Sequence, residues 1–252
     1  MIDLFNLENK VAIVTGASRG LGQGMCIALA QAGANIIGVS QSSMAETKNK
    51  VESLGKKFIE VQADLTKTDK IDEIITTSIN NFGKIDILVN NAGMIRREDA
   101  INYSEKDWDD TINLNLRTLF FLSQAVAKQF IKQNSGGKII NIASMLSYQG
   151  GIRVPAYTAS KSAVMGLTKA LANEFAKYNI NVNAIAPGYM ATDNTAPLRA
   201  DEKRSGEILE RIPAGRWGTP EDLGGTVIYL SSKASDYVNG YCIAVDGGWL
   251  AR

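Results

Sequence analysis

The stretch Val11-Ala12-Ile13-Val14-Thr15-Gly16-Ala17-Ser18-Arg19-Gly20-Leu21-Gly22 decides the fold of this 252-residue chain. Its apolar and β-branched start predicts a buried strand, and the residues after Gly20 predict a helix. Glycines at this junction permit a tight turn and let the backbone approach a pyrophosphate, which the helix N-terminus attracts. The context of strand, glycine turn and helix therefore predicts a dinucleotide site. Its expected members are Gly16, Ser18, Arg19, Gly20, Leu21 and Gly22.

Strand-like and helix-like segments alternate along the rest of the chain. The expected strands are 11–15, 36–39, 58–62, 85–89, 138–143, 180–185 and 242–245, and the expected helices lie near 21–32, 43–55, 68–82, 105–133, 156–178 and 220–231. Runs that are apolar on both faces indicate a parallel sheet covered by helices. We predict one domain over residues 1–252, an α/β Rossmann-like doubly wound parallel sheet of about seven strands with helices on both faces. The segment near 189–213 lacks a strand pattern and predicts a small lid over the site.

The composition excludes several classes of function. The formal net charge is +1, from 27 basic and 26 acidic residues, so no basic field exists to attract nucleic acid or an anionic membrane. The chain has no histidine, which excludes a Ser-His-Asp hydrolase. Cys26 and Cys242 fit no metal or redox spacing, and we expect both to be buried. We see no signal peptide or spanning segment and expect a cytoplasmic protein without a metal.

Ser144, Tyr157 and Lys161 are the candidate catalytic residues. Tyr157 and Lys161 are four residues apart, which places them on one face of a helix. A nearby ammonium favours the phenolate and lowers the tyrosine pKa. Ser144 follows an apolar run and is expected at the C-terminal end of a strand, where ligands bind in open parallel sheets. Ser144 could hold a substrate oxygen while Tyr157 transfers its proton.

The residues expected to determine the preference for NAD or NADP are compatible with either coenzyme. Ser40 and Gln41, at the end of the second strand, are neither the acid that favours NAD nor the arginine that favours NADP. Arg19 could reach a 2′-phosphate or could simply be solvated. Asp64 could bind an adenine amino group or form a turn. The turn Asn91-Ala92-Gly93 suits backbone packing against a coenzyme.

These motifs, with Asn115 and Pro187-Gly188, resemble in order and spacing those of the short-chain dehydrogenases. The resemblance implies that Tyr157 is the general acid/base, that Lys161 lowers its pKa and binds the nicotinamide ribose, and that Ser144 orients the substrate oxygen. It implies that Asn115 supports a water relay to Lys161. It extends the coenzyme site to Leu65, Pro187, Gly188, Met190 and Thr192, and it implies a homotetramer.

Further stretches around residues 95–99, 144–155 and 245–252 resemble family members that use NAD on deoxy sugar acids in uronate breakdown. This resemblance implies reversible hydride transfer between NAD(H) and a hydroxyl or ketone of a small sugar acid. The carboxylate needs a cation, preferably an arginine. We favour Arg153 and then Arg96, and Gln149 could bond sugar hydroxyls. The alternatives are an NADPH-dependent reductase of 3-oxoacyl carrier protein and a non-catalytic nucleotide-binding scaffold.

Overall fold

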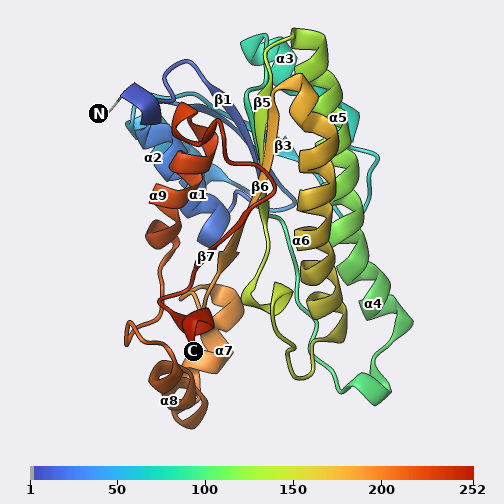
Figure 1. The fold of residues 1–252 in the computed structure, drawn as a ribbon, viewed down its shortest axis with the longest axis vertical. Helices are drawn as coiled ribbons and strands as arrows, with labels where there is room; N and C mark the ends of the chain where they lie inside the picture. Colours follow the sequence, from blue (N-terminus) through green and yellow to red (C-terminus); the bar gives the residue numbers. More distant parts are fainter. Residues whose placement is uncertain (1–2) are drawn as a thin grey trace.

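The computed structural model describes residues 3–252, and its core is one parallel sheet between two layers of helices (Figure 1). The strands are β1 (Val11–Thr15), β2 (Asn35–Ser40), β3 (Phe58–Gln62), β4 (Ile87–Asn90), β5 (Gly137–Ile142), β6 (Ile180–Pro187) and β7 (Cys242–Val245). The α-helices are α1 (Gly20–Gln31), α2 (Ala45–Ser53), α3 (Ile71–Phe82), α4 (Glu105–Ile112), α5 (Leu119–Gln133), α6 (Pro155–Phe175), α7 (Ala196–Ala200), α8 (Glu202–Arg211) and α9 (Gly224–Ser231).

The seven strands run in the order β3-β2-β1-β4-β5-β6-β7, all pairs being parallel. From β1 the chain adds β2 and β3 on one side of the sheet. It then returns to the other side of β1, where β4, β5, β6 and β7 follow in order. The carboxyl ends of β1 and β4 therefore diverge into loops that leave a crevice between them, which is the usual ligand site of such sheets. This topology confirms the predicted doubly wound fold.

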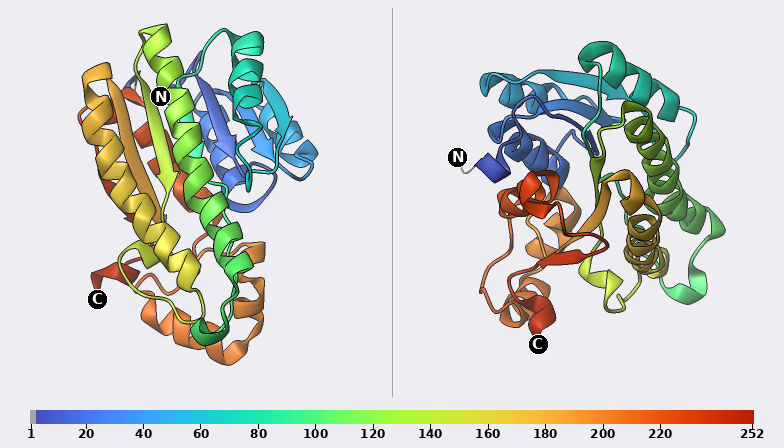
Figure 2. Two further views of the ribbon diagram at one scale, coloured as in Figure 1. Left: turned by 90° about the vertical axis from the view of Figure 1, so that its right-hand side faces the viewer. Right: turned by 45° about the horizontal axis from the view of Figure 1, so that its top comes forward.

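Alternate residues of each strand enter different cores, as the pleat requires. Ala12 and Val14 pack with α1 and α9 on one face, whereas Val11 and Ile13 pack with α3, α5 and α6 on the other. Figure 2 shows the two layers of helices on opposite faces of the sheet. Both faces are covered, which explains why β1 is apolar from Val11 to Val14 and buried along its whole length.

The long helix expected over 105–133 is interrupted. Residues 113–118 form a π-helical segment between α4 and α5, so the prediction of a single regular helix is wrong. A π turn accommodates one extra residue and commonly occurs at functional sites. Its location is informative because Asn115 lies inside it and is fully buried.

Cys242 is half-buried rather than buried, because β7 is an edge strand with one open side. Cys26 is buried in α1 as expected. Among the helices of residues 3–252, none has the length and hydrophobicity to cross a bilayer. No group of three or more potential ligand side chains within this range could hold a metal ion.

The segment expected as a lid contains α7 and α8, which lie beyond the carboxyl ends of the strands (Figure 1). A separate apolar cluster anchors it, in which Ile208 and Ile212 pack with Met145 and Trp249. The C-terminal residues are thereby tied to the same end of the molecule as the predicted catalytic residues.

Candidate active site

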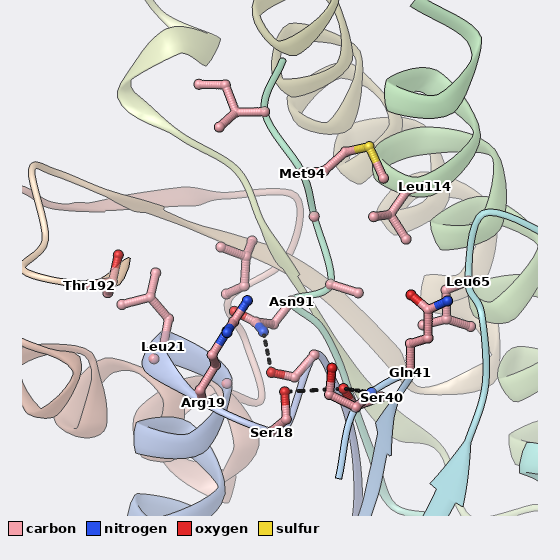
Figure 3. A pocket seen from close by; sticks show the side chains of 18 of the residues that line it. Ser18, Arg19, Leu21, Ser40, Gln41, Leu65, Asn91, Met94, Leu114 and Thr192 are labelled. Atoms are coloured by element: carbon pink, nitrogen blue, oxygen red, sulfur yellow. Dashed lines mark hydrogen bonds between the residues drawn. The ribbon is translucent and has the colours of Figure 1, made fainter. Parts of the chain in front are cut away.

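A cavity of about 420 Å³ opens at the crevice between β1 and β4. Figure 3 shows Arg19, Leu21 and Thr192 along one side and Ser40, Gln41 and Leu65 along the other. Of the predicted residues, those that line the cavity are Gly16, Ser18, Arg19, Gly20, Leu21, Gly22, Ser40, Asp64, Leu65, Asn91, Ala92, Gly93, Tyr157, Lys161 and Thr192. Residues from distant parts of the sequence thus share one surface.

The glycine turn is built for close backbone approach. Gly16 has φ +67°, and a Cβ there would lie 2.7 Å from the Asn91 amide nitrogen. A Cβ on Gly22 would lie 2.0 Å from the carbonyl oxygen of Gly16. Any larger side chain would displace the turn, so both glycines are required by the close packing of the turn against α1 and the loop after β4. These residues fit a dinucleotide pyrophosphate, since amide donors and a helix N-terminus face the cavity.

Thr15 joins the glycine turn to the turn after β4. Its hydroxyl oxygen accepts hydrogen bonds from the backbone nitrogens of Asn91 and Ala92 at 3.0 and 2.9 Å. The Asn91 side chain donates to the carbonyl oxygen of Thr15 at 2.8 Å. The two walls of the crevice are therefore held at a fixed separation by the carboxyl ends of their own strands.

Small hydroxyl side chains stand at the end of β2. The Ser40 hydroxyl donates to that of Ser18 at 3.1 Å, across from the glycine turn (Figure 3). Arg19 lies 3.6 Å from the carboxylate of Asp193, and both side chains are exposed. Asp64 Oδ1 accepts from the backbone and the hydroxyl of Thr66 at 3.0 and 2.8 Å, and these bonds hold the pKa of Asp64 below its usual value. Asp64 therefore forms a turn and also lines the cavity.

Lys161 and Asn115, two of the predicted catalytic residues, are both buried. The ammonium of Lys161 donates to the carbonyl oxygen of Ile142 at 2.6 Å and lies 5.6 Å from the centre of the Tyr157 ring. The Asn115 side chain accepts from the backbone nitrogen of Met94 and donates to its carbonyl oxygen and to Ser160. The π turn therefore serves to bring Asn115 between α6 and the loop after β4.

Ser144 follows β5 by two residues, as the strand prediction required. Its hydroxyl accepts a hydrogen bond from the backbone nitrogen of Leu146 at 3.1 Å, which fixes the start of a short turn. Ser147 closes that turn and donates to the carbonyl oxygen of Lys161 at 2.6 Å. The Ser144 turn and helix α6 are thus locked together next to Tyr157.

Burial shifts the pKa values of Tyr157 and Lys161 in opposite directions. Desolvation raises the pKa of the Tyr157 phenol, while hydrogen bonding by Ser144 and the positive charge of Arg97 act in the opposite direction. Burial lowers the pKa of Lys161 to about 8. Lys161 remains mostly protonated at neutral pH, and for Tyr157 desolvation of the phenol is the largest influence. A further positive charge near Tyr157 is needed to favour the phenolate at neutral pH.

Several predicted residues lie outside the cavity. Gly188 and Met190 line a smaller neighbouring hollow, and Pro187 ends β6. Gln149 Oε1 accepts from Arg211 and from the Trp249 indole, both at 3.3 Å, so it anchors α8 and the C-terminal residues. These positions support the walls of the site rather than face the open space.

The two favoured arginines are also placed elsewhere. Arg153 is paired with Asp99 at 3.0 Å and Glu98 at 3.8 Å, and Arg96 is paired with Asp107 at 3.5 Å. Neither lines the cavity, whereas Arg97 does. Sequence spacing could not separate adjacent Arg96 and Arg97, because their directions depend on the path of a loop. Met94, Ile95 and Leu114 also line the cavity and carry no sequence signal of their own.

The fold and this cluster define a nicotinamide-dependent oxidoreductase. The family model for short chain dehydrogenase matches residues 10–203, and the chain belongs to this family. The chain is 65% identical over 252 residues to 2-dehydro-3-deoxy-D-gluconate 5-dehydrogenase of Escherichia coli, with both chains fully covered. It is 55% identical to the Bacillus subtilis enzyme of the same name, over 99% of this chain and 98% of the relative.

Solved structures agree with these relatives. A protein of Agrobacterium tumefaciens, provisionally named 2-deoxy-D-gluconate 3-dehydrogenase and solved with bound NADP, superposes with a TM-score of 0.94 and 50% identity, over 99% and 100% of the two chains. A gluconate 5-dehydrogenase of Burkholderia cenocepacia, in complex with NADP and tartrate, superposes with a TM-score of 0.93 and is 36% identical, over 99% of this chain and 98% of the other. The resemblance found in the sequence to deoxygluconate dehydrogenases of this family is confirmed.

Proposed function

We propose that this chain catalyses reversible hydride transfer between a nicotinamide coenzyme and a secondary hydroxyl or ketone of a deoxy sugar acid, in uronate breakdown. The substrates proposed are 2-dehydro-3-deoxy-D-gluconate and 2-deoxy-D-gluconate, the compounds in the names of its full-length relatives. The observation that carries the proposal is the cluster of Ser144, Tyr157 and Lys161 beside a cavity that also presents an arginine.

When bound, the coenzyme accepts or returns the hydride. The chain's own residues handle the oxygen and its proton. Ser144 donates a hydrogen bond to the substrate oxygen, and Tyr157 removes the hydroxyl proton during oxidation and returns it during reduction. Lys161 holds positive charge near the phenol, and Asn115 supports proton exchange between Lys161 and water. The glycine turn, Asp64, Leu65 and the residues from Asn91 to Gly93 hold the coenzyme, with Pro187, Gly188, Met190 and Thr192 supporting the nicotinamide end.

NAD is the coenzyme that we propose, with NADP also accepted. No acid occupies the end of β2 among Ser40, Gln41 and Ser42, so no charge there repels a 2′-phosphate. Arg19 is close enough to Asp193 for an ion pair, and the pair is exposed and weak, so the guanidinium is free to turn toward a phosphate. Both relatives solved with NADP are consistent with this tolerance.

A sugar acid also requires a cation near the reacting carbon. We assign the carboxylate to Arg97, which lines the cavity and whose charge acts on Tyr157. This replaces Arg153 and Arg96 as carboxylate ligands and moves Gln149 from the substrate to the support of α8. A guanidinium binds a carboxylate through two parallel hydrogen bonds, which orients as well as attracts the acid.

A matched assay tests the proposal. NAD and NADP are each combined with 2-dehydro-3-deoxy-D-gluconate, 2-deoxy-D-gluconate and a 3-oxoacyl thioester, and absorbance of the reduced coenzyme is followed. Activity with the sugar acids is expected, and activity restricted to the thioester with NADPH would instead identify a carrier-protein reductase. Tyr157→Phe should retain coenzyme binding and lose turnover by roughly 10² or more. If the unaltered protein binds the coenzyme but turns over none of these substrates, the result would favour a non-catalytic nucleotide-binding scaffold.

We further propose that residues 1–252 act as one catalytic domain, with the segment 189–213 closing over bound substrate. The same proposal places the protein in the cytoplasm as a homotetramer. Exposed aromatic and aliphatic side chains on the outer helices, namely Trp108, Phe121 and Ile131, support assembly through α4 and α5. Light scattering after size-exclusion chromatography tests the tetramer, and cell fractionation tests the location.

A further inference from the structure

The loop Met94–Asp99, here called the arginine loop, carries charges on four consecutive residues, from Arg96 to Asp99. It leaves the coenzyme-facing turn after β4 and runs toward α4. Its first residue is fixed by Asn115, which accepts from the Met94 nitrogen at 2.9 Å and donates to the Met94 oxygen at 3.0 Å. The remaining residues of the loop are held by partners on both sides of Arg97.

On the α4 side, Arg96 lies 3.5 Å from a carboxylate oxygen of Asp107. The carbonyl oxygen of Arg96 also accepts from the Tyr103 hydroxyl at 3.4 Å. Both the backbone and the side chain of Arg96 are therefore directed away from the cavity. Arg97, the next residue, instead lines the cavity.

On the other side, Arg153 holds Glu98 and Asp99. Its Nε lies 3.0 Å from Asp99 and its Nη2 lies 3.8 Å from Glu98. Its carbonyl oxygen accepts from the backbone nitrogen of Glu98 at 3.0 Å. One residue thus binds the arginine loop through its side chain and its backbone together.

Arg153 makes these contacts from an unfavourable conformation. Its φ is +64°, in the left-handed region that disfavours a residue with a long side chain. Such a conformation persists when the surrounding contacts determine it, and these outliers gather at functional sites. Arg153 also lies four residues before Tyr157, so its contacts connect the arginine loop directly to the start of α6.

These contacts leave the Arg97 side chain available to bind an anion in the cavity. No carboxylate of residues 3–252 lies within ion-pair distance of it, and it lines the cavity. We propose that Arg153, through Glu98 and Asp99, is a positioning residue that holds the arginine loop so that Arg97 faces the substrate carboxylate. This inference rests on the proposed function, and it assigns Arg153 a role that involves no contact with substrate.

The test compares an acid with its neutral counterpart, 2-deoxy-D-gluconate and 2-deoxy-D-gluconamide, in steady-state assays. Arg153→Gly removes the whole side chain, guanidinium included, and glycine adopts the left-handed φ readily, so the substitution introduces no backbone strain. We expect KM for the acid to rise about threefold to tenfold, since a charge-assisted contact is weakened indirectly. KM for the amide and kcat for both should stay within about twofold. Arg153→Lys should recover part of the loss.

Two comparisons make the result decisive. Glu98→Gln with Asp99→Asn should reproduce the effect and add nothing to Arg153→Gly, because one interaction is lost either way. Lys50→Ala, which removes an exposed ion pair on α2, should leave the acid and the amide unchanged. An equal rise in KM for both substrates, or a change in melting temperature alone, overturns the positioning role.

Arg97→Gln separates this inference from the proposed function. If Arg97→Gln leaves the preference for the acid over the amide intact, the carboxylate assignment fails. If Arg97→Gln abolishes that preference while Arg153→Gly retains it, only the positioning role of Arg153 is overturned.

Discussion

Lys161→Met probes the cost of the buried ammonium in the catalytic cluster. The side chain of Lys161 is nearly inaccessible, and burial lowers its pKa from 10.5 to about 8. At about 1.4 kcal/mol per pKa unit, the charge destabilises the folded protein by about 3 kcal/mol at neutral pH. Methionine removes this penalty and also the hydrogen bond to the Ile142 oxygen, which costs about 1–3 kcal/mol. The variant should therefore be inactive and yet about as stable as the original protein.

The sign of the pH dependence follows from proton linkage. Below pH 8 the folded and unfolded chains both hold the Lys161 proton, and the folded protein bears the full penalty. Between pH 8 and 10.5 the folded protein has released this proton while the unfolded chain still binds it, so stability rises with pH. The unfolding free energy of the original protein minus that of Lys161→Met should rise by about 3 kcal/mol over this window.

Urea unfolding of both proteins at a series of pH values measures that difference. Repeating the pair in a Tyr157→Phe background removes any contribution from the neighbouring phenol. Lys57→Met, which alters an exposed lysine far from the cavity, should give a difference that does not vary with pH in this way. A flat difference for Lys161→Met would show that its ammonium is not destabilised by burial, and the account of the Tyr157 environment would fail with it.

The remaining predictions concern the coenzyme site. Gly22→Ala places a Cβ against the Gly16 oxygen, so coenzyme binding followed by fluorescence should be lost and the melting temperature should fall; retained binding would contradict the role given to the turn. Ser40→Asp introduces a carboxylate at the end of β2, and it should lower kcat/KM for NADP at least about tenfold more than for NAD, since a like charge opposes the 2′-phosphate. Equal losses with the two coenzymes would mean that the phosphate lies elsewhere. Arg19→Ala should weaken NADP binding without changing the affinity for NAD, and titration calorimetry can measure both affinities. If neither affinity changes, the main role of Arg19 is its ion pair with Asp193.

The elements that sequence predicted best are those controlled by local pattern. The β1 strand and its glycine turn were predicted at the correct residues, because burial on both faces and the need for a small residue are read directly from composition. The interrupted helix was predicted as continuous, since nothing local in residues 113–118 requires a π turn. That turn is decided by Asn115, which bonds to Met94 and Ser160 from distant elements.

The sequence by itself determined the layered α/β fold and the glycine turn after β1, and it predicted Ser144, Tyr157 and Lys161 as the catalytic candidates. These depend on periodicity and on fixed spacing, both of which are properties of the linear chain. Only the tertiary structure decided which arginine faces the cavity. Adjacent Arg96 and Arg97 are equivalent in a sequence, and the ion pairs that orient their loop come from α4 and from Arg153, which approach only after the sheet has formed.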